Sequence, residues 1–284
     1  MKKGLNFLSF PRDFGFRDCC RIARELGFDG VEPRLAEAGE FGIGTPDAEL
    51  EKLAKGVDID IHSMACGLYG TFPLSSQDDA VRQRGIEIAA RHIEIAALLG
   101  AETVLIVPGR VKGNGSRDAA RTPYDRAYEN ALRSFAEIAR SAEKHKVHVG
   151  IENVWNMFLL SPLEMRAFID AIGSDYIGAY VDVGNVVVTG YPEDWIRILG
   201  PRIKKIHIKD FKRSVGNIGG FCSLGEGDVD WPAVMSALTD TGYDDYCTLE
   251  FAPVYQTYSE QLLRNSLSFM RFAMDGSDSD ERTT

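Results

Sequence analysis

Short apolar runs alternate with longer amphipathic runs along the whole chain, and this alternation predicts eight strand and helix pairs. The helical period is clearest in residues 79–99 and 123–145, where the apolar positions share one face. The expected strands are residues 5–8, 30–32, 58–62, 103–107, 147–152, 177–182, 203–208 and 246–250. The expected helices are residues 14–26, 46–55, 79–99, 123–145, 162–171, 192–199, 231–241 and 260–274.

The helix ends carry their own signals. Thr45, Thr122 and Ser161 each precede a proline, so each is expected to cap a helix whose first residue is that proline. Several helices end in glycine before the next strand, as at Gly27 and Gly242, which is typical of short connections from helix to strand.

Eight such pairs in 284 residues favour an α/β fold, a single (β/α)8 barrel of the TIM barrel type. The alternative is an open doubly wound sheet, which normally carries a glycine fingerprint after its first strand, and residues 9–13 do not have one. We expect one domain over residues 1–274 and a polar, disordered tail over residues 275–284. Residues 111–120 are expected to form a flexible excursion after the fourth strand.

The composition is that of an ordinary globular protein, 44% hydrophobic and 26% charged. The net charge of −10 weighs against a nucleic-acid partner, which requires a basic face. No export signal is evident and no run approaches the length of a membrane span, so no membrane partner is expected. Five cysteines without a C-x-x-C pair indicate neither a disulfide framework nor a thiolate zinc site, which favours a cytoplasmic location. Whether the chain forms a homo-oligomer stays open.

Polar residues end the last four expected strands. Because successive side chains of a strand point to opposite faces, Glu152, Asp182, His207 and Glu250 fall on the inner face, at the strand ends where barrel active sites lie. A buried carboxylate needs a proton, a cationic side chain or a metal ion to neutralise it. Taken alone, each residue could be an ordinary salt-bridged one. Together, three carboxylates and an imidazole suit one Mn²⁺, Zn²⁺, Co²⁺ or Mg²⁺ ion.

Six short motifs lie at or just after strand ends. They are Phe28-Asp-Gly-Val-Glu32, Gly150-Ile-Glu-Asn153, Val181-Asp-Val-Gly-Asn185, Lys205-Ile-His-Ile-Lys-Asp210, Leu224-Gly-Glu-Gly-Asp-Val-Asp-Trp231 and Thr248-Leu-Glu-Phe251. In this order and spacing they resemble the sugar phosphate isomerase/epimerase family of xylose isomerase-like barrels, over nearly the whole chain. The resemblance implies that Glu152, Asp182, His207 and Glu250 bind one divalent metal ion, and that the two glutamates also transfer protons. It places Arg213 where an arginine of the epimerases holds the substrate.

Two positions depart from the family pattern. Several relatives have a histidine three residues after the sixth-strand aspartate, where this chain has Asn185, and Val107-Pro108-Gly109 offers no histidine after the fourth strand. The more distantly related endonuclease IV uses histidines at such places to hold three zinc ions. Their absence, together with the acidic net charge, argues against a DNA repair enzyme and leaves a site for one metal ion.

The predicted cluster suits proton transfer beside a ketone. A metal ion chelated by adjacent oxygens of an α-hydroxyketone would stabilise the enediolate that forms when the neighbouring C–H proton leaves. With Glu152 and Glu250 on opposite faces, that carbon would be inverted, which is the 3-epimerisation of a ketose or ketose phosphate. Proton return to the neighbouring carbon would give an aldose–ketose isomerase, and an inosose-type dehydratase is possible on the same scaffold. The leading hypothesis is therefore an isomerase of the epimerase kind.

Substrate contacts are predicted around this cluster. The candidates are Glu32, His62, Trp155, Asn185, Lys209, Arg213 and Glu226. Lys209, Lys212 and Arg213 precede the glycine-bearing residues 216–220, and cations beside backbone amides suit a phosphate. The sequence thus favours a phosphorylated sugar as the small-molecule partner, with a mobile, solvated loop as the alternative interpretation of these charges.

Overall fold

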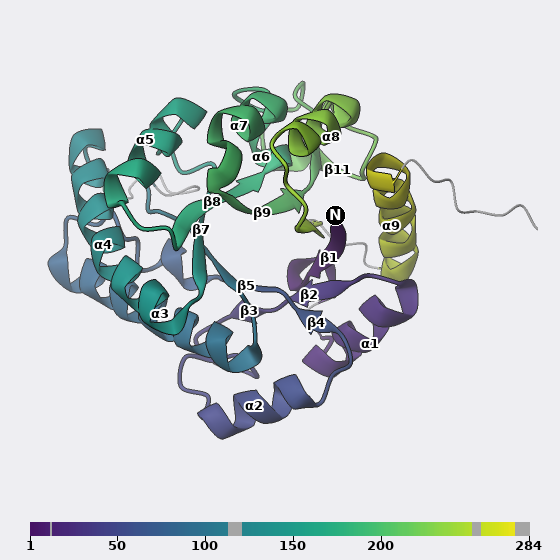
Figure 1. Cartoon of the computed structure of the whole chain (residues 1–284), viewed down its shortest axis with the longest axis horizontal. Helices are drawn as coiled ribbons and strands as arrows, with labels where there is room; N and C mark the ends of the chain where they lie inside the picture. The colour runs from purple at the N-terminus through teal and green to yellow at the C-terminus, as the bar shows by residue number, and fades with distance from the viewer. Residues whose placement is uncertain (12, 113–120, 252–256, 276–284) are drawn as a thin grey trace, which may run out of the picture.

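The computed structural model describes residues 1–11, 13–112, 121–251 and 257–275. Its main sheet is parallel and curls into a barrel that is ringed by helices (Figure 1). The strands of this sheet are β1 (Lys2–Asn6), β2 (Gly30–Glu32), β3 (Arg34–Leu35), β4 (Asp60–Ile61), β5 (Ser63–Cys66), β6 (Thr103–Ile106), β7 (His148–Glu152), β8 (Ile177–Asp182), β9 (Ile203–Ile208) and β12 (Tyr246–Leu249). The helices are α1 (Phe16–Leu26), α2 (Asp47–Lys55), α3 (Asp79–Leu99), α4 (Tyr124–His145), α5 (Pro162–Ile172), α6 (Val183–Val186), α7 (Pro192–Leu199), α8 (Trp231–Asp240) and α9 (Ser259–Asp275).

Two broken strands close the barrel. Only Pro33 separates β2 from β3, and only His62 separates β4 from β5, so each pair acts as one strand. β2 pairs with β4 and β3 pairs with β5, both in parallel register. The ten segments of the sheet therefore make up the eight-stranded barrel that the alternation of strands and helices predicts.

The two faces of the strands differ as expected from their alternation. Val149 and Ile151 of β7 are fully buried and share the main apolar core with helix residues such as Phe135. A separate small apolar cluster that includes Leu105 and Tyr180 fills part of the barrel interior. Burial of the outer strand faces under the helices, favourable by about 25 cal/mol per Å² of apolar surface, therefore holds the strand ends in fixed positions.

The predicted element boundaries agree closely with the structure, with two corrections. The predicted helices start and end within two residues of those observed. The first strand lies earlier than predicted, because the chain turns into a short 3-10 helix at Phe7–Ser9, capped by the Asn6 side chain. The third begins at Asp60, and Asp58, predicted to point inward, is exposed and pairs with Arg24 at 2.8 Å.

One of the three predicted helix caps forms. The Ser161 hydroxyl accepts a hydrogen bond from a backbone N–H in the first turn of α5, at 3.2 Å. Before α2 and α4, Pro46 and Pro123 are themselves the N-cap residues. Thr45 and Thr122 therefore lie one position outside the place from which a side chain caps a helix, and the prediction of caps there is wrong.

A short hairpin that the sequence analysis did not predict follows β9. Strand β10 (Asp210–Phe211) pairs antiparallel with β11 (Phe221–Cys222). The buried Asp210 carboxylate accepts hydrogen bonds from the backbone N–H groups of Phe211, Gly225, Gly227 and Val229 and from the indole N–H of Trp231. One carboxylate thus fixes the chain from the hairpin to the start of α8.

The end of the chain is described as far as Asp275. This residue is the last of α9, and its carboxylate pairs with Lys3 Nζ at 2.8 Å, so the first residue of the predicted tail is helical. Residues 276–284 of that tail, and residues 113–120 of the predicted excursion, lie outside the described residues. Within the described part of the chain, no helix has the length and apolar character needed to cross a membrane. The single-domain boundary stays a prediction.

Candidate active site

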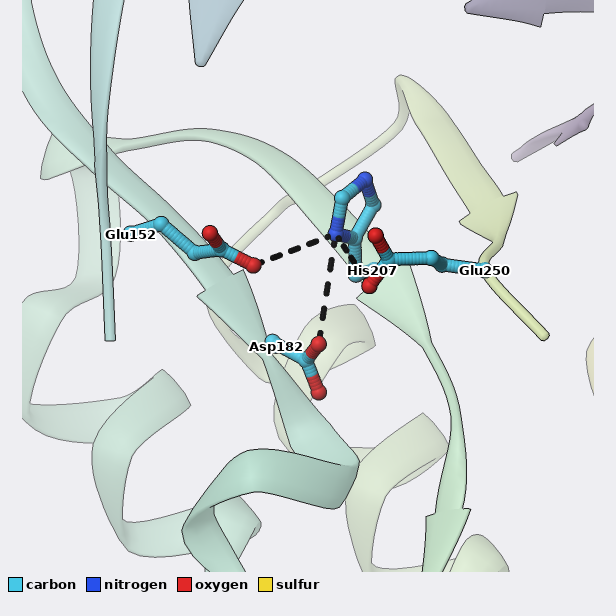
Figure 2. Close-up of side chains that lie close together, drawn as sticks. All are labelled: Glu152, Asp182, His207 and Glu250. Carbon is cyan, nitrogen blue, oxygen red and sulfur yellow. Dashed lines mark ion pairs between the residues drawn. The ribbon is translucent and has the colours of Figure 1, made fainter. Parts of the chain in front are cut away.

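The carboxyl ends of four strands bring the predicted acidic residues and the histidine together. Glu152 ends β7, Asp182 ends β8, His207 is next to last in β9, and Glu250 follows β12. The parallel register sets Asp182 directly beside His207. One ligand atom from each of the four side chains lies within 4.8 Å of the others (Figure 2). The four residues therefore form one cluster at the mouth of the barrel.

His207 lies at the centre of the cluster and is fully buried. Its Nδ1 faces carboxylate oxygens of Glu152, Glu250 and Asp182 at 3.5, 3.6 and 3.9 Å, and has no hydrogen-bond partner among the described residues. Figure 2 shows Glu152 and Glu250 approaching this atom from opposite sides. A buried ring nitrogen without a partner is costly, and a metal ion among the four groups would satisfy it.

The donor set fits a divalent metal ion. Three carboxylate oxygens and one imidazole nitrogen are hard to borderline ligands, which suit Mn²⁺, Mg²⁺, Co²⁺ or Zn²⁺. Ligand atoms within 4.8 Å of one another need only small movements to reach one ion, because such bonds are about 2.0–2.2 Å long. The cluster includes no cysteine from the described part of the chain, unlike most structural zinc sites.

Lys209 brings a positive charge to the same carboxylates. Its Nζ lies 2.8 Å from Asp182 Oδ2, also contacts Glu250, and lies 4.9 Å from the centre of the Phe221 ring. Burial lowers the pKa of Lys209, but the neighbouring carboxylates outweigh this effect and raise it above its usual range. Lys209 therefore stays charged and partly neutralises the cluster.

The two glutamates differ in proton affinity. Burial raises the pKa of Glu152 to about 7, and the negative charges of Glu250 and Asp182 act in the same direction. Burial also acts to raise the pKa of Glu250, but the charges of Lys209 and His207 outweigh it and lower that pKa. Without a metal ion, Glu152 therefore holds a proton more readily than Glu250, and two carboxyl groups of unequal proton affinity suit a proton-transfer pair.

Asn153, to which the sequence analysis gives no role, fixes the backbone at the cluster. Its side-chain amide accepts from the N–H of Asp182 and donates to the C=O of Asp182, both at 2.9 Å. Asp182 Oδ1 accepts the Asn185 N–H at 2.9 Å, and Asn185 Nδ2 donates to the Asn153 carbonyl at 3.0 Å. These bonds join the end of β7 to the end of β8. The polar pair Glu152-Asn153 directly after an apolar strand is the one sequence signal for this role.

A pocket of about 620 Å³ opens at the cluster. It is lined by Leu8, Glu152, Val154, Trp155, Asn185, Lys209, Ile218, Gly219, Phe221 and Glu250. The structure thus places Trp155, Asn185 and Lys209, three of the predicted substrate contacts, in the pocket wall. The Trp155 ring stacks on Phe221 with centroids 5.1 Å apart, and its Nε1 donates to the Asn185 carbonyl at 2.9 Å. An apolar wall beside a few polar groups is typical of a small-molecule site.

Glu32 and His62, two other predicted substrate contacts, do not line this pocket. Glu32 is fully buried, and its carboxylate bonds His207 Nε2 at 2.9 Å, on the side of the ring opposite the cluster. His62 is 2% exposed and stacks on Tyr246 with centroids 3.9 Å apart, and burial lowers its pKa to about 3. Both side chains are buried inside the barrel and outside this pocket wall, so their contact with a substrate stays a prediction.

The Lys212 and Arg213 side chains of the predicted basic loop also lie outside the pocket wall, although Ile218 and Gly219 of the same loop line it. Arg213 is exposed, its Nη2 donates to a backbone carbonyl at 3.2 Å, and its guanidinium carbon is 5.0 Å from the centre of the Tyr191 ring. Lys212 pairs with Glu226 at 3.8 Å, and both are exposed. Phe221 of the same hairpin lines the pocket instead. The structure therefore places the Arg213 and Glu226 side chains outside the wall of this pocket, and the phosphate site predicted for this loop stays a prediction.

Curated proteins with similar sequences are ketose 3-epimerases. The L-ribulose 3-epimerase of Mesorhizobium japonicum is 28% identical over 250 residues, which cover 86% of this chain and 76% of that protein. The putative L-ribulose-5-phosphate 3-epimerase SgbU of Escherichia coli is 26% identical over 253 residues, or 84% of this chain and 85% of that protein. Epimerases are isomerases, the class of enzyme expected from the sequence.

Solved structures share the fold. D-psicose 3-epimerase in the presence of D-fructose aligns with a TM-score of 0.80 and 21% identity, covering 96% of this chain and 99% of that one. The 3-keto-D-glucoside 4-epimerase YcjR of E. coli aligns with a TM-score of 0.76 and 16% identity, covering 95% and 99%. A family model described as xylose isomerase-like TIM barrel matches residues 20–272. The chain belongs to the xylose isomerase-like TIM barrel family.

Proposed function

We propose that the protein is a divalent-metal-dependent 3-epimerase of a ketose or ketose phosphate. One observation carries the proposal: Glu152 and Glu250 approach His207 Nδ1 from opposite sides (Figure 2), and both glutamates line the same pocket. The L-ribulose 3-epimerase and the putative L-ribulose-5-phosphate 3-epimerase among the similar proteins support a ketose as substrate.

The metal site is the first part of the proposal. We assign Glu152, Asp182, His207 and Glu250 as the ligands of one Mn²⁺, Zn²⁺, Co²⁺ or Mg²⁺ ion. When bound, this ion would supply positive charge beside the substrate carbonyl, which would ease loss of the neighbouring proton. The protein holds Asp182 in place through Asn153, whose side chain bonds both backbone groups of that residue.

The two glutamates move the proton. In a 2-ketose the C3–H bond lies next to the C2 carbonyl, so C3 is the carbon that can lose and regain a proton. Removal by one glutamate and delivery by the other to the opposite face inverts C3. Each carboxyl group must change its protonation state once per turnover.

The pocket wall orients the sugar. Lys209 Nζ lies beside Asp182 and Glu250 in the wall, so we expect it to donate a hydrogen bond to a substrate oxygen near them. Trp155 and Phe221 form an apolar surface next to these polar groups. We expect the C–H face of the sugar to lie against this surface, which also keeps water from the reacting carbon.

Deuterium exchange tests the proposed reaction. Protein that has been stripped with EDTA and reloaded with Mn²⁺ is incubated in D2O with L-ribulose, L-ribulose 5-phosphate and D-psicose, and the products are examined by NMR. We expect deuterium at C3 of a C3-inverted product and no exchange in the stripped protein. An aldose product would identify an isomerase, and loss of water a dehydratase. No exchange with any sugar would overturn the proposal.

The same assay separates free from phosphorylated substrates. Within the pocket wall formed by the described residues, Lys209 is the one basic side chain, and two carboxylates already compensate its charge. We therefore expect a higher kcat/KM for L-ribulose than for its 5-phosphate, the reverse of the preference that the sequence suggests. A higher kcat/KM for the phosphate would contradict this expectation and leave the epimerase assignment intact.

We place the enzyme in the cytoplasm. Its five cysteines are all free thiols, and four of them are buried. Burial raises the pKa of the Cys19 and Cys20 thiols to about 12, so neither is a reactive thiolate at neutral pH. Unpaired, unreactive thiols are suited to a reducing compartment.

A further inference from the structure

Glu32, which the proposed reaction does not use, has a buried carboxylate that is hydrogen-bonded at both oxygens. Four donors from four different strands or strand ends converge on it. Ser63 Oγ and Tyr180 OH each lie 2.6 Å from Oε2, His207 Nε2 lies 2.9 Å from Oε1, and Asn6 Nδ2 also contacts Oε1. Glu32 is 0% exposed and does not reach the pocket.

This arrangement fixes the hydrogen on the His207 ring. The hydroxyl groups of Ser63 and Tyr180 and the amide of Asn6 all have hydrogens to donate, so the Glu32 carboxylate accepts from each of them and carries no proton of its own. An acceptor 2.9 Å from His207 Nε2 requires the hydrogen to be on Nε2. In the neutral ring Nδ1 then carries a lone pair, and it is Nδ1 that faces the three other carboxylates.

We propose that Glu32 is a positioning residue that holds His207 in the tautomer and ring orientation that direct the Nδ1 lone pair to the metal ion. This inference rests on the metal site of the proposed function. Ligating histidines commonly donate their second ring N–H to a carboxylate, and loss of that carboxylate typically weakens metal binding about 10–100-fold. Ser63, Tyr180 and Asn6 in turn fix the Glu32 carboxylate.

A matched pair of variants separates positioning from simple core stability. Glu32→Gln replaces the charged acceptor of the His207 Nε2–H by a neutral amide oxygen or, in the other amide orientation, by an NH2 group that cannot accept. Tyr180→Phe removes one buried hydrogen bond to the other Glu32 oxygen, Oε2, and leaves the bond from His207 to Oε1 in place. Both variants disturb the same buried network, but only the first disturbs His207 directly.

Metal affinity is the first readout. EDTA-stripped proteins are titrated with Co²⁺ and Zn²⁺ by calorimetry, and circular dichroism records whether each variant is folded. We expect Glu32→Gln to weaken binding about 10–100-fold and Tyr180→Phe to weaken it less than about threefold. In a His207→Gln background, the second change Glu32→Gln should cost no further affinity, because its partner is gone. Equal losses in the two single variants, or an additive loss in the double variant, would overturn the proposal.

The wild-type protein provides a second test that does not depend on a variant folding. In the Zn²⁺-loaded protein, ¹⁵N NMR of the histidine rings should show His207 with a protonated Nε2 and an unprotonated Nδ1. The opposite tautomer would overturn the proposal. Neither readout needs a sugar, so metal binding without epimerisation would remove the proposed function and leave this inference standing. A wild-type protein that binds none of Co²⁺, Zn²⁺, Mn²⁺ and Mg²⁺ would remove both.

Discussion

At the scale of single residues, Glu250 has two proposed roles in the site, as a metal ligand and as a proton-transfer group. Its carboxylate contacts Lys209 and lies 3.6 Å from His207 Nδ1, on the side opposite Glu152. The isosteric change Glu250→Gln removes a metal ligand and a proton-transfer group together. We expect the rate of deuterium exchange at C3 to fall by about 10²–10⁴-fold. The circular dichroism spectrum should not change, because the side chain lies at the barrel mouth and not in the apolar core.

The control for this prediction is the same chemical change on the hairpin. Glu226 is exposed, pairs only loosely with Lys212 at 3.8 Å, and lies outside the pocket. Glu226→Gln should therefore exchange C3 at the wild-type rate. Wild-type exchange by the Glu250→Gln protein would rule out the proposed proton-transfer role of that glutamate.

A buried histidine away from the site predicts loss of stability in acid. His92 of α3 is fully buried, with its Nδ1 3.1 Å from the hydroxyl of Tyr69, and burial lowers its pKa from 6.5 to about 3. The unfolded chain takes up a proton here near pH 6.5, whereas the folded protein does not. The contribution to stability is therefore complete above pH 6.5 and is lost as the pH falls below it. Between pH 6.5 and 5 we expect His92 to reduce the free energy of unfolding by about 2 kcal/mol.

Urea unfolding at a series of pH values measures this effect. Other groups titrate over the same range, so the informative quantity is the difference in slope between the wild type and His92→Gln. The variant should lose about 1 kcal/mol less per pH unit below pH 6.5. Equal slopes for the two proteins would mean that His92 takes up its proton without unfolding.

At the scale of elements, the start of α5 gives a direct comparison among helix caps. Ser161 accepts a backbone hydrogen bond at 3.2 Å, while Thr45 and Thr122 precede prolines that occupy the N-cap positions of their helices. We expect Ser161→Ala to lower the free energy of unfolding by about 1 kcal/mol. Thr122→Ala should change it by less than about 0.5 kcal/mol, as surface substitutions usually do. Denaturant unfolding of both variants measures the difference, and similar losses would contradict the assignment of the caps.

The same comparison shows what local patterns predict about an element. Periodicity places every predicted helix within two residues, because the apolar stripe that packs on the sheet has to run for the whole length of the helix. It does not decide whether a threonine or the following proline is the N-cap residue, because that depends on the backbone angles at one residue. The prolines before α2 and α4 have ψ angles of 141° and 143°, outside the helical region.

At the scale of the whole molecule, the sequence predicts the barrel and the cluster of three carboxylates and one histidine, but it does not predict how deep each inward side chain lies. Alternation along a strand places Glu32, His62 and Glu152 on the inner side, and the structure confirms that all three are buried. Their height along the barrel axis depends on how neighbouring strands are staggered, which no single strand encodes. This stagger places Glu152 in the pocket wall and Glu32 beneath His207.

The direction of the side chains in the loop after β9 is also set by pairing that the sequence does not show. The charges of this loop predict a phosphate site, but the direction of each charge depends on the β10–β11 hairpin, a short pairing without a periodic signal in the sequence. In the hairpin Arg213 lies over Tyr191, and Ile218 and Phe221 line the pocket. The apolar residues of the loop therefore contribute more to the site than its cations do.

The metal ion is expected to stabilise the barrel as a whole, because its four ligands come from the ends of β7, β8 and β9 and from the residue after β12. The ligands are far apart in the unfolded chain, so the ion binds the folded state preferentially. At a free Mn²⁺ concentration one hundred times Kd, the free energy of unfolding should rise by about 2.7 kcal/mol over the EDTA-stripped protein, and by about 1.4 kcal/mol more for each further tenfold increase. Urea unfolding at several Mn²⁺ concentrations measures this dependence.

Glu250→Gln should shift the curve to higher Mn²⁺ concentrations, while Glu226→Gln should follow the wild type. A wild-type midpoint independent of Mn²⁺, and equally of Zn²⁺, Co²⁺ and Mg²⁺, would mean that the cluster is not a metal site.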